Sequence, residues 1–444
     1  MVQWGEDGGS ESDGDSDGGN EFVLVNPAKT PRPETKMLTQ QLADDGNRVS
    51  VVIPKEAEDR METVDDADYV FYDAWFVPGV RYPIPLPSFF TQLFSLIGRA
   101  DVAFVTSYIY LPCLVTTLFA ALLRTPCIVS VDVLVGVRWS YGQSVVDSIA
   151  AIYTHTVGRC TFALSDHLVV PGEYMRTELT RFAPAEKITV IPNGIDVDHF
   201  TAAEETADGR ERERANVGEQ GDAGGRAGVN EQDADRRAGV NERERANGGG
   251  NADANDRTKV GGRTHADERV NLLFVGRLAP VKNIPLLLRS VKRLRDETGT
   301  DYDLTIVGDG EERERYETLA KELELSDAVR FEGFRSNVRE YYRDADVLVL
   351  TSVSEGFPTV LMEAQACGLP VVTTDVGGAR EIVAAGSVVS RDEPGEVAEA
   401  ITSVVTSDSE ELRSTARRHV EQQYSQTELY VRYRDIFQEQ IGSN

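Results

Sequence analysis

The segment 354–364, with the sequence SEGFPTVLMEA, carries the strongest chemical signal in the chain. Glu355 and Glu363 stand eight positions apart in it, and two such carboxylates can bind separate hydroxyl groups of one extended ligand. Pro358 suits the first turn of a helix that closes at Gly368. Because the first backbone N–H groups of a helix lack internal acceptors, the start of this helix predicts a phosphate site.

Two cations supply the opposite charge. Arg277 is joined through Gly276 to the apolar run 272–275, and Lys282 comes five residues later. At the carboxyl end of a strand, an arginine fork and a lysine point charge can together neutralise a diphosphate. The alternative is a pair of solvated surface cations.

These residues must be positioned by strands and helices, and both kinds of pattern alternate along the chain. Strands are expected at 22–25, 49–53, 102–106, 127–131, 168–170 and 188–191, and again at 272–275, 304–307, 329–331, 347–350 and 371–372. Helices are expected at 33–45, 285–296 and 311–324. Strands that alternate with helices indicate parallel, doubly wound sheets, and two such sets indicate two Rossmann-like α/β domains. A ligand cleft is then expected at the carboxyl ends of the strands.

The charge is strongly negative. The chain holds 74 acidic residues against 46 basic ones, a net charge of −28, and only 8 of the basic residues are lysine. This surplus of carboxylates excludes non-specific nucleic-acid binding as the main function, because phosphates would be repelled. The composition is typical of a protein adapted to a high-salt cytoplasm. No signal peptide is recognisable in the acidic, Gly/Ser-rich start, so a cytoplasmic location is expected.

One long segment has neither aromatic residues nor apolar patterning. Between Phe200 and Phe274 there is no Phe, Tyr or Trp, and Gly, Asn, Asp, Glu, Ala and Arg dominate. Such a stretch cannot bury enough apolar area to fold alone, so a low-complexity insertion or linker is expected.

The segment 69–165 is nearly neutral and rich in aromatic residues. It contains five arginines and four aspartates. A buried core predicts this composition, and so does a face that meets a lipid acceptor or the inner membrane surface. Within it, 102–123 has no charged residue and about the length that crosses a bilayer, but Pro112 divides it, so a buried strand followed by a core helix is expected.

Four motifs together resemble the retaining glycosyltransferases of family 4, which have the GT-B fold. The motifs are Gly276–Arg277 with Lys282, the segment from Glu355 to Glu363, Pro192–Asp196, and Gly377–Gly378 with Glu381. The resemblance covers most of the chain outside the start and the insertion. It implies two Rossmann-like domains that face each other across a cleft.

The resemblance implies a role for each motif residue. Arg277 and Lys282 would hold the diphosphate of a nucleotide sugar and stabilise its departure, and Glu355 would contact the transferred sugar. Glu363 would bind the ribose hydroxyls, and Arg330 lies in the segment that would pass near the base. The implied nucleotide-sugar-binding residues are Gly276, Arg330, Gly356, Phe357, Pro358, Thr359, Val360 and Glu363.

The implied activity is a retaining, metal-independent transfer of a sugar from a nucleotide diphosphate sugar to a hydroxyl acceptor, which a lipid could carry. No cofactor is expected, since the nucleotide sugar is a substrate, and the five histidines show no paired metal-ligand spacing. Nucleic acid is not an expected partner. Two alternatives are a nucleotide-sugar epimerase of the same two-domain plan and a non-catalytic binding protein for nucleotide sugars.

The first half departs from the family pattern at two places. Asn26–Pro31 stands where the family commonly has a Gly-Gly turn, and Asp132 stands where a histidine often ends the strand 127–131. Asp132 is therefore the acceptor-site candidate. It could orient an acceptor hydroxyl or serve as a structural carboxylate.

Five segments are expected along the chain. They are an acidic tail at 1–20, an acceptor domain at 21–196, the insertion at 197–269, a nucleotide-sugar domain at 270–405, and C-terminal helices at 406–444 that pack back toward the first domain.

Overall fold

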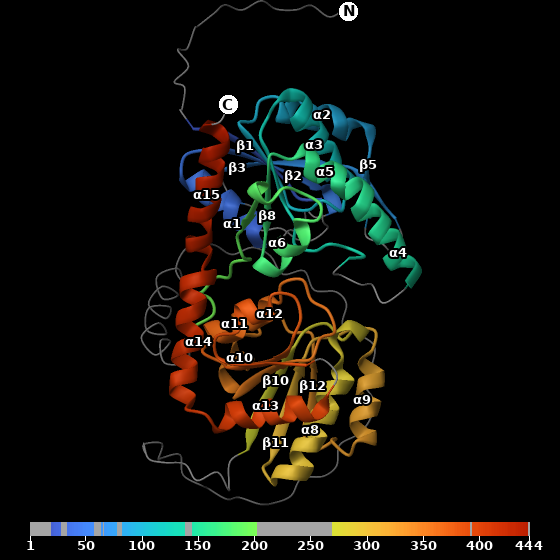
Figure 1. Cartoon of the computed structure of the whole chain (residues 1–444), viewed down its shortest axis with the longest axis vertical. Coiled ribbons are helices and arrows are strands. Elements are labelled where there is room, and N and C mark those ends of the chain that lie inside the picture. The colour runs from blue at the N-terminus through green and yellow to red at the C-terminus, as the bar shows by residue number, and fades with distance from the viewer. Residues whose placement is uncertain are drawn as a thin grey trace, which may run out of the picture. The chain divides into compact units, whose positions relative to one another are not determined.

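A computed structural model describes most of the chain outside its start and its low-complexity segment (Figure 1). The described residues are 19–27, 33–56, 64, 66–77, 82–137, 144–201, 269–390 and 393–442. Most of the predicted acidic tail (1–20) and most of the predicted insertion (197–269) lie outside them.

The first sheet has seven parallel strands in the order β3-β2-β1-β6-β7-β8-β9. They are β1 (Glu21–Val25), β2 (Arg48–Pro54), β3 (Ala67–Tyr72), β6 (Val102–Val105), β7 (Cys127–Ser130), β8 (His167–Val170) and β9 (Ile188–Val190). The helices of this half are α1 (Pro33–Asp44), α2 (Pro87–Ile97), α3 (Leu111–Leu123), α4 (Ser144–Tyr153), α5 (Arg159–Leu164) and α6 (Glu173–Leu179). A separate hairpin pairs β4 (Ala74–Val77) with β5 (Tyr82–Pro85).

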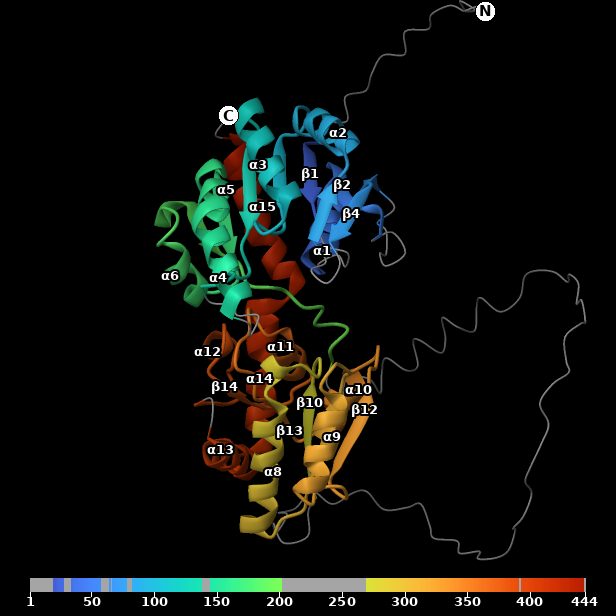
Figure 2. The ribbon, with the colours of Figure 1, turned by 90° about the vertical axis from the view of Figure 1, so that its right-hand side faces the viewer.

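Alternation along β1 explains why helices cover both faces of this sheet. Val23 and Val25 belong to a core that α2, α3, α5 and α6 share, whereas Phe22 and Leu24 belong to a second core with α1. Successive side chains of a strand point to opposite faces, so an unbroken apolar run needs helices on both sides. Figure 2 shows α3 and α5 beside the strands of this half.

The second sheet has six parallel strands in the order β12-β11-β10-β13-β14-β15. They are β10 (Val270–Val275), β11 (Tyr302–Val307), β12 (Val329–Gly333), β13 (Val347–Leu350), β14 (Val371–Thr374) and β15 (Gly386–Val389). Helices α8 (Ile284–Thr298), α9 (Arg313–Glu322), α10 (Arg339–Asp344), α11 (Thr359–Ala366), α12 (Ala379–Ile382) and α13 (Pro394–Thr406) accompany it (Figure 1). Both sheets reverse their strand order beside the first strand, between β1 and β6 and between β10 and β13, as in doubly wound folds.

The last two helices join the two halves. Helix α14 (Ser409–Tyr424) packs on α11, and α15 (Gln426–Gly442) contributes to the core of the first sheet. The ring of Tyr433 meets that of Phe104 at 5.7 Å, edge to face, a favourable geometry for aromatic pairs. Both sheets belong to one compact unit of the chain.

The chain crosses between the halves twice, and the two crossings lie side by side. Ile195 forms a parallel bridge with Ser425, at the junction of α14 and α15. Beyond it, the backbone of residues 197–201 is held by arginines of the second half: the Arg417 guanidinium donates to the carbonyls of Val197 and Phe200, and Arg343 donates to that of Thr201 at 2.7 Å.

The segment 102–123 forms strand β6 and helix α3, as expected from Pro112, which lies at the start of α3. Within the described ranges, no helix combines the length and the apolar character needed to cross a membrane.

Candidate active site

The order of the second sheet brings the predicted cations and carboxylates together. Strands β10 and β13 are neighbours, and ligands of open α/β sheets bind outside the carboxyl ends where the strand order reverses. Arg277 and Lys282 lie in the loop after β10. Glu355 lies in the loop after β13, residues 351–358, which we call the donor loop.

Lys282 and Glu355 form a largely buried ion pair. The Nζ of Lys282 lies 2.6 Å from Oε1 of Glu355, and the two side chains are 17% and 11% exposed. The Ser352 hydroxyl donates to the same carboxylate oxygen. The Thr351 hydroxyl donates to the backbone carbonyl of Lys282 at 3.2 Å, so the end of β13 also fixes the lysine backbone. The pair therefore presents a preorganised cation at the carboxyl edge of the sheet.

Arg277 is exposed at the same edge. In the part of the chain that the structure describes, no hydrogen bond or ion pair engages its guanidinium group. Gly308, which follows β11, has a φ of +139°, and a Cβ there would lie 1.9 Å from the carbonyl oxygen of Gly276. Only glycine permits this contact, so no side chain stands between the neighbouring loop and the base of the Arg277 loop.

The donor loop leads into α11, which begins at Thr359 with Pro358 as its N-cap and ends before Gly368. This confirms the predicted helix and its glycine terminus, since Gly368 has a φ of +74°. The backbone of Gly377, which has a φ of +49°, packs closely against the donor loop. A Cβ on Gly377 would lie 2.1 Å from the carbonyl oxygen of Gly356.

Glu363 lies in the second turn of α11. The Tyr342 hydroxyl donates to its Oε2 at 2.7 Å. Burial raises the pKa of the Glu363 carboxyl, and the hydrogen bonds from Tyr342 and Thr359 partly oppose this rise. Burial and the nearby Glu363 charge also raise the pKa of Tyr342 well above its usual value, so its hydroxyl stays a donor. A carboxylate held in this way can accept hydrogen bonds from a sugar diol.

We expect Tyr342→Phe to raise the pKa of Glu363 further, because the variant loses a hydrogen bond that favours the ionised carboxylate. If the ionised form binds the nucleotide, affinity falls as the pH drops through this pKa, so the loss of affinity should begin at a higher pH in the variant. The Tyr342→Phe substitution should also destabilise the fold by about 1–3 kcal/mol, since a buried carboxylate oxygen loses its hydrogen-bond donor. Titration of nucleotide affinity against pH, with thermal unfolding, measures both effects. Identical pH profiles for variant and wild type would contradict the expectation.

Arg330 is not brought to this cluster. It is the second residue of β12, where its Cα pairs with Thr305, which in turn pairs with Leu273. Leu273 lies three residues before Gly276, so Arg330 lies about 10 Å short of the carboxyl edge at ~3.3 Å per residue. Its exposed guanidinium contacts only the Thr305 hydroxyl, at 3.5 Å, within the described chain. The expected strand at 329–331 is present as β12, and the position of this segment near the base stays a prediction.

Asp132 follows β7 and lies beside the donor loop. A Cβ on Gly356 would lie 3.5 Å from the Asp132 carbonyl oxygen and 2.9 Å from Cγ1 of Val133. The Ser130 hydroxyl reaches Oδ1 of Asp132 at 3.4 Å. The acceptor-site candidate therefore adjoins the loop that carries Glu355.

Sequence reasoning missed Gln365. Its side chain is fully buried in α11, donates to the carbonyls of Leu361 and Ile382, and accepts from the backbone N–H groups of Ala384 and Ala385. A lone glutamine in a helix gives no sequence signal for this role. It ties α11, and hence Glu363, to the segment before β15.

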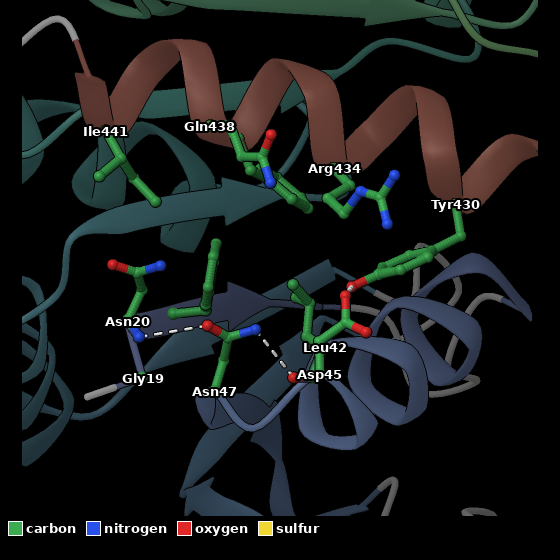
Figure 3. Close-up of a pocket in the computed structure, with 11 residues that line it drawn as sticks. Gly19, Asn20, Leu42, Asp45, Asn47, Tyr430, Arg434, Gln438 and Ile441 are labelled. Carbon is green, nitrogen blue, oxygen red and sulfur yellow. Dashed lines mark hydrogen bonds between the residues drawn. The ribbon is translucent and has the colours of Figure 1, made fainter. Parts of the chain in front are cut away.

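A pocket of about 370 Å³ lies away from this cluster, between α15 and the amino end of β1 (Figure 3). Phe22, Leu42 and Phe437 contribute apolar lining. The Tyr430 hydroxyl donates to Oδ2 of Asp45 at 2.6 Å at its rim. None of the predicted site residues lines it.

Comparison with solved structures defines the fold class as GT-B. The chain matches HepE from Anabaena in complex with UDP, with a TM-score of 0.66 and 15% identity over 94% of this chain and 100% of that one. It also matches sucrose-phosphate synthase from Thermosynechococcus elongatus, with a TM-score of 0.66 and 18% identity over 96% and 100% of the two chains. At identities of 15% and 18%, the similarity shows a shared fold and nothing more.

Two family models match successive parts of the sequence. Residues 35–199 match the model for Glycosyltransferase Family 4, and residues 257–423 match the model for glycosyl transferases group 1. The chain belongs to glycosyltransferase family 4, as the motifs indicated.

Relatives by sequence match the chain over shorter stretches. The D-inositol 3-phosphate glycosyltransferase of Geodermatophilus obscurus is 40% identical over 167 residues, which cover 35% of this chain and 37% of that protein. A Campylobacter jejuni N-acetylgalactosaminyltransferase that acts on a diphospho-undecaprenol-linked sugar is 41% identical over 112 residues, 25% of this chain and 30% of that protein. The matched stretches thus span 37% and 30% of the length of these two relatives.

Proposed function

We propose that the protein is a retaining, metal-independent glycosyltransferase that moves a sugar from a nucleotide diphosphate sugar to a hydroxyl acceptor. The observation that carries this proposal is the gathering of Arg277, Lys282 and Glu355 at the carboxyl edge of β10 and β13, with Glu363 on the following helix. HepE, one of the solved structures similar in fold, binds UDP, which supports a nucleotide substrate.

The residues divide the proposed reaction between them. Arg277 and Lys282 neutralise the diphosphate as it leaves, and the backbone N–H groups of Phe357, Thr359 and Val360 donate to the sugar and the phosphate. Glu363 accepts the ribose hydroxyls and Glu355 contacts the transferred sugar. Two cations in one preorganised site can stabilise the leaving group without a metal ion.

Retention of configuration is proposed through front-face attack. The bond from the anomeric carbon to the diphosphate oxygen breaks, the acceptor oxygen bonds to the same face, and the acceptor proton passes to the leaving diphosphate. The position of Glu355 supports this route, because its carboxylate is already engaged by Lys282 and Ser352 and is poorly placed to act as a nucleophile.

Incubation with nucleotide sugars tests the proposal. We expect transfer to an added acceptor or slow hydrolysis, with the configuration at the anomeric carbon retained, and no loss of activity in EDTA. Isomerisation of the sugar would favour the epimerase alternative, which the family match disfavours, and absence of turnover would favour a binding protein. Thermal shifts with UDP, GDP and ADP would identify the base, since a ligand stabilises the fold in proportion to RT ln(1 + [L]/Kd).

For the acceptor we propose a lipid-linked or other amphiphilic hydroxyl compound, reached by a cytoplasmic protein at the inner face of the membrane. Helix α4 exposes Val145, Ile149 and Ile152, which are 73%, 63% and 65% exposed at helical spacing. Helix α3 exposes Leu118 and Leu122, at 45% and 70%. Both helices belong to the nearly neutral segment 69–165, and large exposed apolar patches are typical of interaction surfaces.

We expect the protein to float with liposomes and to stay bound as salt rises, because the net charge of −28 opposes anionic lipid and attachment must come from apolar burial. Polybasic attachment would weaken with salt instead. The double variant Ile149→Asp/Ile152→Asp should lower binding by at least about 10-fold, since fully burying one isoleucine is worth about 1.5–3 kcal/mol.

Val431→Asp is the matched control, because Val431 is 37% exposed on α15, outside this segment. Flotation should be unchanged in that variant. A wild-type protein that never floats at any salt concentration, yet transfers sugar to a soluble acceptor, would refute membrane attachment.

A further inference from the structure

Gly356, in the donor loop, contacts two segments of the first half. The hydroxyl of Tyr174, on α6 after β8, donates to the Gly356 carbonyl. Val133, after β7, lies against the Gly356 Cα, because a Cβ there would come within 2.9 Å of its Cγ1.

A second contact holds the start of α6 from the opposite half. The two carboxylate oxygens of Glu381, on α12, accept the backbone N–H groups of Glu173 and Tyr174 at 2.8 and 2.9 Å. Hydrogen bonds to a carboxylate are stronger than neutral ones. The Tyr424 hydroxyl donates to the Glu381 carbonyl at 2.8 Å, which fixes the backbone of α12. Glu381 of the second half therefore fixes the backbone position of Tyr174.

The Tyr174 ring lies between the two hydrophobic cores and packs against residues of both. A Cβ on Gly378 would lie 2.6 Å from a ring carbon of Phe357 and 3.2 Å from Cε1 of Tyr174. A side chain at this position would push both rings away from α12. The Gly377–Gly378 pair therefore permits the approach of Tyr174 to the donor loop.

The hydrogen bond to Gly356 has a consequence for the next residue. The Gly356 carbonyl and the Phe357 N–H belong to one planar peptide unit and point in opposite directions. A glycine allows this unit many orientations, so an anchor on its oxygen sets the direction of the Phe357 N–H. That N–H is one of the donors proposed to contact the sugar and the phosphate.

We propose that Tyr174 is a positioning residue: its hydroxyl, placed by Glu381, orients the Gly356–Phe357 peptide so that the donor loop is competent only when the acceptor half is docked on it. The inference rests on the proposed sugar transfer. Tyr174 itself touches no reacting atom, and it links acceptor-side packing to donor-side geometry.

Tyr174→Phe tests the inference. Tyr430→Phe is the matched control: it loses one hydroxyl bond, to Asp45, at a pocket that no donor-loop residue lines (Figure 3). We expect Tyr174→Phe to lower kcat by about 10-fold while KM for the nucleotide sugar changes by less than about 3-fold, because Arg277, Lys282 and Glu363 still bind the nucleotide. Tyr430→Phe should leave both constants unchanged.

Hydrogen exchange supplies a readout that needs no turnover. The amides of Gly356 and Phe357 should exchange faster in Tyr174→Phe than in wild type or Tyr430→Phe, and amides 173 and 174 should exchange faster in Glu381→Gln. If Tyr174→Phe matches Tyr430→Phe in kcat and in exchange, the inference is wrong. If the wild type transfers no sugar, the proposed function fails, and the exchange of the Gly356 and Phe357 amides still decides whether Tyr174 orders this peptide.

Discussion

Replacing Arg277 or Lys282 by alanine is expected to lower kcat by about 10²–10³, the range seen when one preorganised electrostatic donor is lost from a reaction centre. The developing charge on the leaving diphosphate is spread over oxygens that both cations would face. Lys282→Ala should cost at least as much as Arg277→Ala, because it also leaves the Glu355 carboxylate, 11% exposed, without its cation.

Steady-state kinetics with a saturating nucleotide sugar measures this effect. Lys292→Ala and Arg293→Ala are the matched controls, since both cations lie on α8 in exposed pairs with Asp296 and Glu297. These controls should keep near-normal turnover, as surface ion pairs contribute little. Near-normal turnover in both Arg277→Ala and Lys282→Ala would contradict the proposal that these two cations bind the diphosphate.

Glu363→Gln is expected to raise KM for the nucleotide sugar by about 10–100-fold with a smaller change in kcat. Hydrogen bonds to a charged group are worth roughly 1.5–3 kcal/mol, and an amide oxygen replaces the carboxylate without its charge. Glutamine has nearly the same shape and still accepts from the Tyr342 hydroxyl, so the fold should persist.

The pH dependence provides a second readout for this variant. Burial raises the pKa of the Glu363 carboxyl, so in the wild type the carboxylate is lost, and KM rises, at a higher pH than for an ordinary glutamate. This rise of KM at acidic pH, the acid limb of the profile, should disappear in Glu363→Gln. Glu399→Gln, on the exposed face of α13, is the control. An unchanged KM and an unchanged acid limb in Glu363→Gln would show that the ribose lies elsewhere.

The central strands of both sheets were predictable because they are buried on both faces. Strands β1, β6, β10 and β13 appear in the sequence as short runs of apolar residues, and the structure places them within one or two residues of the expected bounds. Helix α8, expected at 285–296, spans Ile284–Thr298. Continuous apolar runs are typical of parallel strands covered by helices.

Two edge strands, β3 and β15, were missed for the complementary reason. Strand β3 is buried fully only at Tyr72, and β15 begins with an exposed glycine and is half-buried elsewhere. With one neighbour and partial cover, such strands need no unbroken apolar run. The aromatic segment 69–165 likewise proved to be mixed: it supplies a core around α2, α3 and α5, and it also exposes apolar side chains on α3 and α4.

The sequence by itself determined that Arg277, Lys282 and Glu355 lie together at the carboxyl edge of the second sheet, because their placement depends on local spacing. Arg277 and Lys282 follow one strand, Glu355 precedes a helix start, and Glu363 lies one turn inside it, so a single strand–loop–helix pattern predicts each of them. Only the tertiary structure decided which partners orient them. Tyr342, Gln365, Tyr174 and Glu381 act across separations of about 20 to 200 residues. Such hydrogen bonds depend on how strands and helices pack. No repeating sequence pattern indicates which distant residues this packing brings together.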